Sequence, residues 1–447
     1  MKKSLYLILL FTAISYLSGL AQVPQALQNR FQYLLDSSLI NPGVKGISAC
    51  VIMRDNSVWT GHAGDNGSGV AITDSTVFYG GSTTKTFVAT RIMQLWEEGL
   101  IKLDTTYIAY IDPIANVLPQ TTIRQMLTHT SGIFDVILNP SFKTDPIINP
   151  THFFTQQEVL ATYLNQPHVF APGTDQEYSN SNYIILAMIV EAITGNPLHL
   201  ELRKHVFNLI PLKHTYTGAY ETFTEPYCGL WTYIDSTLTD LTSIPHTAIL
   251  SMVLGAGNIV SYPPDEAWFI RNLINGNILS QAGLAEMLQL SPFDNNYGLG
   301  MMAVQFGQDT MVYGHGGSIG NLTEMFHCPK LNLTVVVMIN SENGDLMPFF
   351  GLFLSAYSSI LGIEENSNSL YSFSLFPNPS NEKVYVRLDD YSVNDRIEIF
   401  SASGLLMKTV PVTGKGFSID ISDLPRGIYF VKNISVKRYP VLKLIRK

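Results

Sequence analysis

Apolar residues recur at helical spacing in several separate stretches of the chain. In residues 25–40 they form one stripe that includes Leu27 and Phe31, which predicts an amphipathic helix. A second stripe, in residues 86–98, ends at Gly99, a natural helix stop. The same spacing predicts further helices at residues 121–127, 156–165, 183–194, 265–275 and 347–361.

Other stretches have the alternating or continuously apolar pattern of β-strands and are rich in β-branched and aromatic residues. They predict strands at residues 46–53, 57–62, 297–306, 310–314, 322–328 and 333–339. Because these strands flank a long helical middle, we expect one sheet built from distant segments, with a helical insertion between them. The predicted fold class is therefore α/β. Residues 200–250 show no pattern that assigns them to either structure.

The first 21 residues have the pattern of an export signal. Two lysines precede an apolar run, and small residues follow at Gly19 and Ala21. The run is shorter than the roughly 20 residues needed to cross a membrane, so a signal peptide at residues 1–21 is preferred over an anchor. We expect cleavage after Ala21, and a first folded domain at residues 22–362.

The C-terminal part of the chain differs in both pattern and charge. Residues 363–372 are polar and rich in Ser, Asn and Glu, which is typical of a linker. Beyond them, residues 373–447 alternate short strands with turns, which predicts a small β-sandwich. Residues 371–447 hold 12 Lys and Arg against 7 Asp and Glu, whereas residues 1–370 hold 15 against 29. The change of sign supports a separate C-terminal module.

The composition excludes several classes of protein and site. Hydrophobic residues at 46% and charged residues at 14% are typical of globular domains. The net charge of −9, with no cluster of Lys and Arg, argues against a nucleic-acid partner. Cys50, Cys228 and Cys328 are far apart, so we expect buried thiols rather than a disulfide framework. The histidines have no metal-binding spacing, and no nucleotide-binding glycine loop is present, so we expect neither metal nor cofactor.

The strongest candidate for chemistry is the stretch from Thr76 to Phe87, where a β-prone run meets two glycines, a serine and a helical pattern. The glycines allow a tight turn before the helix begins. Ser82 and Lys85 are three residues apart, so we expect a hydroxyl beside an amine on one helix face. The amine can take the proton of the serine, and N–H groups at the helix end can face the developing negative charge.

Ser-x-x-Lys alone is a weak signal, because the same spacing occurs at Ser380 and Lys383 in the predicted sandwich. Two further motifs could complete a site. Tyr178 could relay a proton, and Asn180, two residues later, could hold a substrate carbonyl. The run His315-Gly316-Gly317 follows a strand, where glycines allow a ligand to approach the backbone closely.

Together, Ser82-Thr83-Thr84-Lys85, Tyr178-Ser179-Asn180 and His315-Gly316-Gly317 resemble the signatures Ser-x-x-Lys, Tyr-x-Asn and Lys/His-x-Gly of the serine β-lactamase and penicillin-binding superfamily. They are most similar to the branch that holds class C β-lactamases, DD-peptidases, D-aminopeptidases and related esterases. The resemblance covers residues 24–362. It implies a β-lactamase/transpeptidase-like fold, in which an antiparallel sheet is flanked by helices and interrupted by an all-helical insertion.

The resemblance also implies acyl transfer through a covalent intermediate on Ser82. Lys85 and Tyr178 would share the general-base and general-acid work. The oxyanion would lie between the N–H groups of Ser82 and Ser318. Asn180 would bind the amide of the substrate's acyl side chain.

His315 and Gly317 complete the expected substrate-binding set at the third motif. Class C β-lactamases usually resemble Lys-Thr-Gly there, so a titratable ring and a hydrogen replace a fixed ammonium and a hydroxyl that would hold a carboxylate. We therefore expect an esterase, or a peptidase acting on D-amino-acid peptides, rather than an efficient β-lactamase. The sequence does not choose between the first two.

Two other functions stay open. A protein on the same scaffold could bind a penicillin or a peptidoglycan fragment without turnover, although a binder has no chemical need of serine, lysine and tyrosine together. In a weaker alternative, the C-terminal domain would serve structural adhesion.

The tail resembles a second known family. Phe376-Pro377-Asn378-Pro379, the run Leu-Pro-Arg-Gly-Ile-Tyr-Phe-Val at residues 424–431 and the basic end are similar to the C-terminal sorting domain of the type IX secretion system of Bacteroidetes. This resemblance covers residues 373–447. It implies the secretion machinery as a partner, beside a small-molecule or peptide substrate. It also implies export through the periplasm to the outer cell surface or beyond, and leaves the oligomeric state open.

Overall fold

A six-stranded antiparallel sheet in the order β2-β1-β11-β10-β9-β8 forms the centre of the larger domain in the computed structural model. Its strands are β1 Gly46–Ile52, β2 Val58–Gly64, β8 Met302–Phe306, β9 Thr310–Ser318, β10 Leu322–Cys328 and β11 Leu333–Ile339. The structure describes residues 23–39, 43–234, 237–294, 296–306, 310–342, 346–360, 373–392, 395–401, 406–434 and 442–447. The expected signal peptide and linker lie outside the described residues.

The two central strands pair segments from opposite ends of the domain. Ala49 of β1 lies opposite Val337 of β11, and every residue of both strands is buried. Burial on both faces explains why these strands read as continuous apolar runs rather than as an alternation. The expected sheet of distant segments is confirmed.

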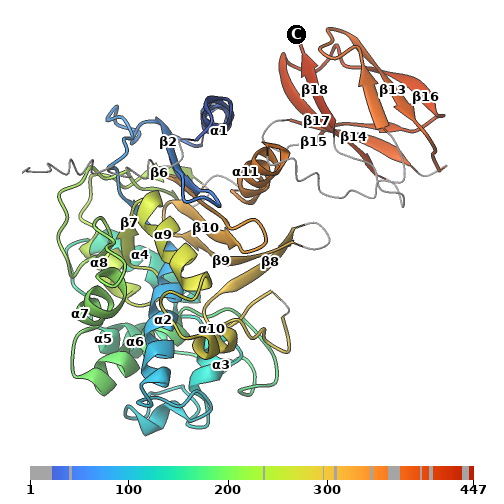
Figure 1. Ribbon diagram of the computed structural model, residues 1–447. Coiled ribbons are helices and arrows are strands. Elements are labelled where there is room, and N and C mark those ends of the chain that lie inside the picture. The colour runs from blue at the N-terminus through green and yellow to red at the C-terminus, as the bar shows by residue number, and fades with distance from the viewer. Residues whose placement is uncertain are drawn as a thin grey trace, which may run out of the picture.

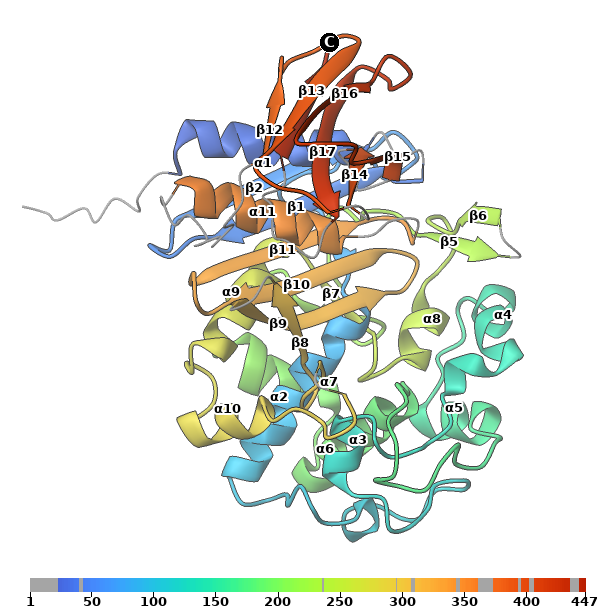
Figure 2. The same cartoon turned by 90° about the vertical axis from the view of Figure 1, so that its right-hand side faces the viewer.

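One face of the sheet is covered by α1 (Gln25–Ser38) and α11 (Met347–Ile360), as Figure 2 shows. Phe31 of α1 and Phe353 of α11 are fully buried, with ring centroids 4.9 Å apart. Trp59 of β2 packs against both rings. The apolar stripe of residues 25–40 is therefore the face by which α1 packs on the sheet.

The opposite face packs against α2 (Thr84–Glu97) and α9 (Pro263–Ile274) (Figure 1). Phe87 of α2 stacks on Phe269 of α9, with ring centroids 3.7 Å apart. The remaining helices are α3 Ile123–Leu127, α4 Pro140–Ile148, α5 Gln156–Tyr163, α6 Ser181–Thr194, α7 Leu198–Leu202, α8 Thr247–Met252 and α10 Gln281–Met287, with the 3₁₀ turns η1 Gly81–Thr83, η2 Tyr107–Ala109 and η3 Val136–Leu138 and the π turn η4 Arg203–Phe207. They form the expected helical insertion.

The stretch 200–250, which has no clear pattern, contains very short strands. A small three-stranded sheet joins β3 Phe78–Tyr79, β7 Ile259–Ser261 and β4 Tyr216–Thr217, and a hairpin joins β5 Trp231–Ile234 to β6 Thr237–Asp240. Strands of two to four residues are too short to show a period, which explains the missing signal. The small sheet matters because β3 leads directly into the turn that carries Ser82.

Two expected strand boundaries are wrong. The predicted strand 297–306 begins only at Met302, because Gly300 adopts a φ of +75° and donates to the carbonyl of Leu127 instead of a neighbouring strand. The predicted strand 310–314 instead continues to Ser318, paired with β10. The glycines that end the sequence pattern let the two backbones approach closely: a Cβ on Gly314 would lie 1.8 Å from the carbonyl oxygen of Met325.

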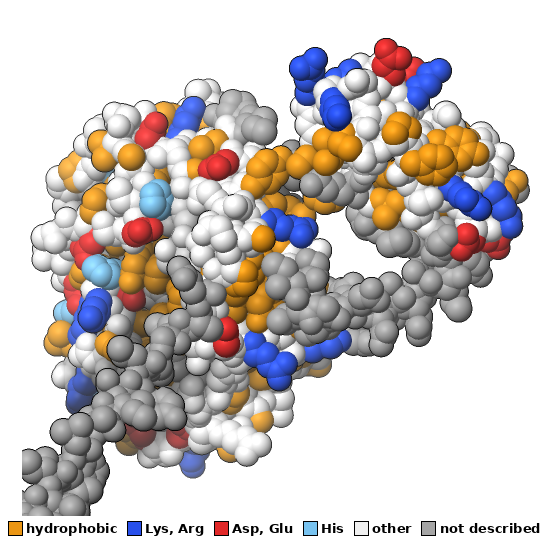
Figure 3. All heavy atoms as spheres, turned by 45° about the horizontal axis from the view of Figure 1, so that its top comes forward, with side chains coloured by type: hydrophobic (Ala, Val, Ile, Leu, Met, Phe, Trp, Pro, Cys, Tyr) orange, Lys and Arg blue, Asp and Glu red, His pale blue; other side chains and the backbone are white. Residues whose placement is uncertain are grey.

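The tail forms the expected β-sandwich. Its two sheets have the orders β12-β13-β16 and β15-β14-β17-β18. The strands are β12 Phe373–Phe376, β13 Lys383–Leu388, β14 Arg396–Ser401, β15 Leu406–Pro411, β16 Gly416–Asp420, β17 Gly427–Ile434 and β18 Leu442–Arg446. Val384 and Ile397, one from each sheet, are fully buried in a common core. Figure 3 shows Lys and Arg side chains at several places on the visible surface of the tail.

Cys50, Cys228 and Cys328 are all free and buried, as expected. Among the described helices, no single one is long and apolar enough to cross a membrane. The bent pair formed by residues 181–194 and 198–207 meets that test only by length and composition.

Candidate active site

Ser82 lies in a tight turn between β3 and α2. We name the residues Gly80 to Thr83 the nucleophile turn, because they carry the candidate nucleophile Ser82. The N–H of Gly80 donates to the carbonyl of Ile259 on β7 at 2.8 Å. Gly81 has a φ of +55°, and a Cβ there would lie 2.7 Å from the backbone nitrogen of Ser318. Only glycine meets both conditions at low cost.

The end of β9 packs directly on this turn. A Cβ on Gly317 would lie 1.8 Å from the carbonyl oxygen of Gly80 and 3.1 Å from the backbone nitrogen of Ser82. The absence of a side chain therefore lets the backbone of Gly317 and Ser318 lie flat against the nucleophile turn. This places the N–H groups expected to form the oxyanion hole on two backbones that are in contact.

Lys85 lies one helical turn after Ser82 and points back at it. Its Nζ is 2.9 Å from Ser82 Oγ and donates to Asn180 Oδ1 and to the carbonyl of Ala256, each at 2.7 Å. Burial of the amine lowers its pKa to about 7, and the charge of Asp135 opposes this shift. A substantial fraction of Lys85 is therefore neutral near pH 7, which a general base requires.

Tyr178 stands at the mouth of the site and is 39% exposed. Its ring centroid lies 4.1 Å from that of His129 and 4.9 Å from Lys85 Nζ. Packing raises the pKa of Tyr178 above its usual value, and a hydrogen bond with Ser82 acts in the opposite direction. The phenol is thus neutral at physiological pH and has a proton to donate.

Asn180 is the residue that precedes α6, so its side chain lies at the start of a buried helix. Its Oδ1 accepts from Lys85, and its Nδ2 donates to Asp135 Oδ2 at 3.0 Å. The turn before Asn180 is held by His129, whose Nδ1 accepts from the backbone N–H of Ser179 at 3.2 Å. The first two motifs therefore meet, as expected from their residue types.

His315, which the sequence analysis expects to contact the substrate, lies in a buried position. Its side chain is buried, one ring nitrogen lies 2.9 Å from the hydroxyl of Tyr297, and the other lies 2.6 Å from the carbonyl oxygen of Gly316. Burial lowers the pKa of His315 to about 3, and the nearby Lys85 contributes to the shift. The ring is neutral and held inside the protein because it faces the aromatic cluster beside Tyr178 rather than solvent.

Three acidic residues that the sequence analysis did not single out contact the site. Asp135 accepts from Asn180, Glu266 Oε1 accepts from Thr83 Oγ1 at 2.9 Å, and Glu342 Oε1 accepts from Ser318 Oγ at 3.1 Å. Each comes from a loop or helix far from its partner in the sequence, and no spacing rule links them. Only the folded structure brings these three acidic side chains to the site.

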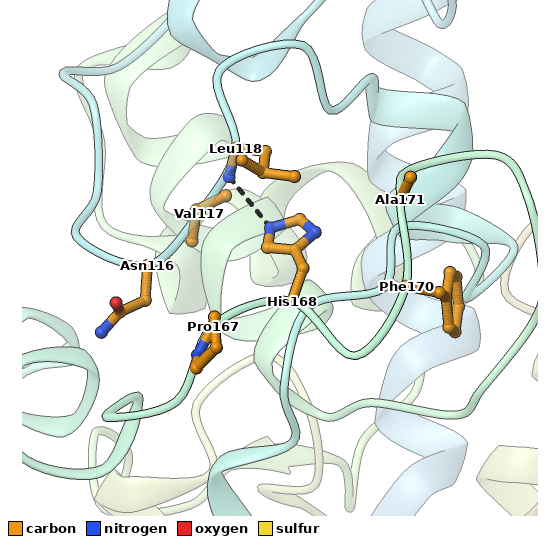
Figure 4. A pocket seen from close by; sticks show the side chains of 7 residues that line it. All are labelled: Asn116, Val117, Leu118, Pro167, His168, Phe170 and Ala171. Carbon is orange, nitrogen blue, oxygen red and sulfur yellow. Dashed lines mark hydrogen bonds between the residues drawn. The ribbon is translucent and has the colours of Figure 1, made fainter.

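The hollow in Figure 4 is separate from this arrangement. It has a volume of about 550 Å³ and is lined by Asn116, Val117, Leu118, Pro167, His168, Phe170 and Ala171. His168 Nε2 accepts there from the N–H of Leu118 at 2.9 Å. None of the expected site residues lines it. In the described part of the chain, no group of three His, Cys, Asp or Glu side chains could hold a metal ion.

Solved structures share the fold of the larger domain. A D-stereospecific amidohydrolase from Streptomyces sp. has a TM-score of 0.64 and 26% identity, covering 74% of this chain and 98% of that protein. The D-amino acid amidase of Ochrobactrum anthropi SV3, complexed with D-phenylalanine, has a TM-score of 0.65 and 26% identity, covering 77% and 100%. The β-lactamase/transpeptidase-like fold is confirmed.

The sequence comparisons identify the family. The Beta-lactamase family model matches residues 27–348, so the chain belongs to the Beta-lactamase family. The chain is 33% identical over 232 residues to the putative penicillin-binding protein PbpX of Bacillus subtilis (strain 168), covering 50% of this chain and 53% of that protein. It is 26% identical over 306 residues to the D-aminopeptidase of Brucella anthropi, covering 66% and 56%. It spans about half the length of these curated relatives.

A second family model, the secretion system C-terminal sorting domain, matches residues 374–447. The sandwich is therefore a sorting domain for type IX secretion, which directs the chain to the cell surface or the extracellular space. This confirms the expected partner machinery and destination.

Proposed function

We propose that this protein is a secreted serine hydrolase that forms an acyl intermediate on Ser82 and cleaves amide or ester bonds, in D-amino-acid peptides or amides or in carboxylic esters. One observation carries the proposal. The buried Lys85 amine, with its lowered pKa, lies 2.9 Å from Ser82 Oγ at the start of α2. A hydroxyl paired with a partly neutral amine is an activated nucleophile.

In the proposed acylation, Ser82 Oγ attacks the substrate carbonyl while Lys85 Nζ takes the hydroxyl proton. The negative oxygen of the tetrahedral intermediate accepts hydrogen bonds from the N–H groups of Ser82 and Ser318. The bond to the leaving amine or alkoxide then breaks, and Tyr178 donates a proton to it and is reprotonated by Lys85. Deacylation repeats the sequence with water as nucleophile, and Ser82 regains its proton.

The substrate class follows from the third motif and from the relatives. His315 is neutral and buried, so it offers no fixed positive charge to a substrate carboxylate. This disfavours β-lactams, which carry a carboxylate next to the scissile ring. The relatives with named activities, an amidase, an amidohydrolase and an aminopeptidase specific for D-residues, support amide bonds of D-amino acids as the first substrates to test.

The test offers the full chain four acyl donors in parallel: D-phenylalanine amide, a D-Ala-D-Ala peptide, a short-chain p-nitrophenyl ester and a chromogenic cephalosporin. Product formation and intact-protein mass are followed together. We expect turnover of at least one of the first three, and loss of about 10³-fold or more of kcat in Ser82→Ala. Ser380→Ala is the matched control, since Ser380 has the same Ser-x-x-Lys spacing but lies in the sorting domain.

Full turnover in Ser82→Ala, or no product and no adduct with any donor, would overturn the proposal. A stable adduct on Ser82 without turnover would instead support the alternative, a penicillin- or peptidoglycan-binding protein on the same scaffold.

A further inference from the structure

Asp135 approaches the site from the segment that follows Gly132, on the side of Asn180 away from Lys85. Only 6% of its surface is exposed. It precedes the short turn η3, and its Oδ1 accepts from the backbone N–H of Ile137 at 3.3 Å. Its Oδ2 accepts from Asn180 Nδ2 at 3.0 Å. The carboxylate is therefore fixed by its own backbone and aimed at the amide of Asn180.

These contacts link Asp135 to the nucleophile through two intermediates. Asn180 Oδ1 accepts from Lys85 Nζ at 2.7 Å, and Lys85 Nζ lies 2.9 Å from Ser82 Oγ. A carboxylate only accepts hydrogen bonds, so it selects the NH₂ end of the amide and leaves the oxygen end for the amine. Without Asp135, Lys85 alone would orient the amide, and a neutral amine, which can accept as well as donate, would allow the NH₂ end to turn toward it.

Asp135 also supplies charge. The rings of Tyr178 and Tyr183 lie 4.9 Å and 5.6 Å from Lys85 Nζ. The pKa of each phenol is raised because its hydroxyl is desolvated by the surrounding protein, so both stay neutral. His129 and His315 also face Lys85, and burial lowers the pKa of each, so both rings are neutral. Asp135 is the described neighbour of Lys85 that can bear a negative charge. Burial raises the pKa of Asp135, and its hydrogen bonds and the charge of Lys85 act in the opposite direction.

We propose that Asp135 is a positioning residue of the active site: it orients the Asn180 amide so that Lys85 is held against Ser82, and its charge sets how readily Lys85 gives up its proton. The proposal rests on the proposed function, because it assigns a role within the same acylation step. It also narrows the expected role of Asn180, because one of the amide's hydrogens is already used inside the protein.

The first test is the pH dependence of kcat/KM in Asp135→Asn, with whichever donor the wild type turns over. Asparagine keeps the shape and an accepting oxygen but removes the charge. A positive Lys85 loses its stabilising partner, so its pKa falls and the neutral base persists to lower pH. We expect the acid limb of the profile to move about one pH unit toward lower pH.

The second test removes the contact as well. In Asp135→Ala, the Asn180 amide loses its anchor, and we expect kcat to fall about 10- to 100-fold with little change in KM. At pH 8.5, where Lys85 is largely neutral, the same substitution in the Asn180→Ala background should have almost no further effect on kcat, because the orienting contact of Asp135 acts through Asn180. Asp145→Asn is the matched control: Asp145 accepts from Tyr163 on the neighbouring α5, and its side chain has no hydrogen bond to a site residue among the residues that the structure describes.

An acid limb in Asp135→Asn that coincides with that of Asp145→Asn would overturn the proposal, and so would additive losses in the Asp135→Ala/Asn180→Ala pair. If Asp135→Ala does not fold, the near-isosteric Asp135→Asn still decides the question. These results differ from a failure of the proposed function, in which the wild type itself forms neither product nor adduct.

Discussion

Burial of one amine determines how Ser82 can be activated. Lys85 is fully enclosed, and its solvation loss outweighs the favourable charge of Asp135, so its pKa falls from 10.5 to about 7. Tyr178 shifts the other way and keeps its proton. These opposite shifts support the proposed division of the work, in which the amine is the base and the phenol is the proton donor.

This division predicts a pH profile for the wild-type enzyme. Because only neutral Lys85 can accept the proton of Ser82, kcat/KM should fall about tenfold per pH unit well below pH 7 and level off above it. The measurement is kcat/KM for a neutral p-nitrophenyl ester from pH 5 to 8.5, corrected for spontaneous hydrolysis. A flat profile across pH 7 would exclude Lys85 as the titrating base.

At this scale the sequence predicts a residue well when a spacing rule encodes its role. Ser82 and Lys85 are one helical turn apart, and the structure places them within hydrogen-bond distance. Asp135 has no such rule, because its partner Asn180 is reached only through the fold. The sequence singles out His315 because the next two glycines allow a ligand to approach the backbone and because the motif resembles a family signature. Its burial against Tyr297 depends on a loop that the pattern assigns to a strand.

A hydrogen bond between Thr83 and Glu266 connects the nucleophile turn to α9. Glu266 on the first turn of α9 is fully buried, its Oε1 accepts from Thr83 Oγ1, and its other carboxyl oxygen has no hydrogen-bond partner in the described part of the chain. A Cβ on Gly80 would lie 2.7 Å from Glu266 Oε1, so the carboxyl fits closely under the turn. A charged group in such a place is costly, and burial raises the pKa of Glu266 to about 8.

This contact predicts a pH-dependent stability. A carboxyl with a raised pKa in the folded state contributes stability that is fully present below the unfolded pKa near 4.5 and lost as pH rises toward 8. Glu266→Gln cannot ionise, so its stability should match that of the wild type near pH 4.5 and exceed it near pH 8, by roughly 4 kcal/mol. Thermal unfolding at pH 4.5, 6 and 8 measures the difference.

Glu177→Gln serves as the control, because Glu177 is exposed. This variant should show the same change of stability with pH as the wild type. A Glu266→Gln variant that loses stability equally at all three pH values would contradict this prediction, because it would show that the pKa of Glu266 is the same in the folded and the unfolded protein.

Among the elements, long periodic segments were predicted well and short ones were not. The stripe of residues 25–40 gives α1, and the apolar runs give β1 and β11. By contrast, β3 and β7, which position the nucleophile turn, have two and three residues. Their pairing depends on contacts between distant segments, and the local periodicity of the sequence carries no information about such contacts.

In the whole molecule, the domain that carries the candidate active site and the sorting domain have separate hydrophobic cores. The buried core of the tail contains only residues from 373 to 444, and the two large clusters of the other domain contain none of these. The change in charge between the two parts follows the same boundary. Each part therefore has a buried apolar core of its own.

We therefore propose residues 22–362 as an independent catalytic domain, and expect it to keep kcat within about twofold of the full chain.

Within the full chain, Ile397→Ala should remove buried contacts of the tail alone, since Ile397 is fully buried in its core. It should lower the free energy of unfolding of the tail alone, by about 3 kcal/mol, and leave the rate of hydrolysis unchanged. Phe353→Ala, in the core between α1 and α11, is the reciprocal variant and should lower the other transition. Calorimetry of the full chain separates the two transitions; a single transition that both variants lower together would mean that the sorting domain and the hydrolase domain fold as one unit.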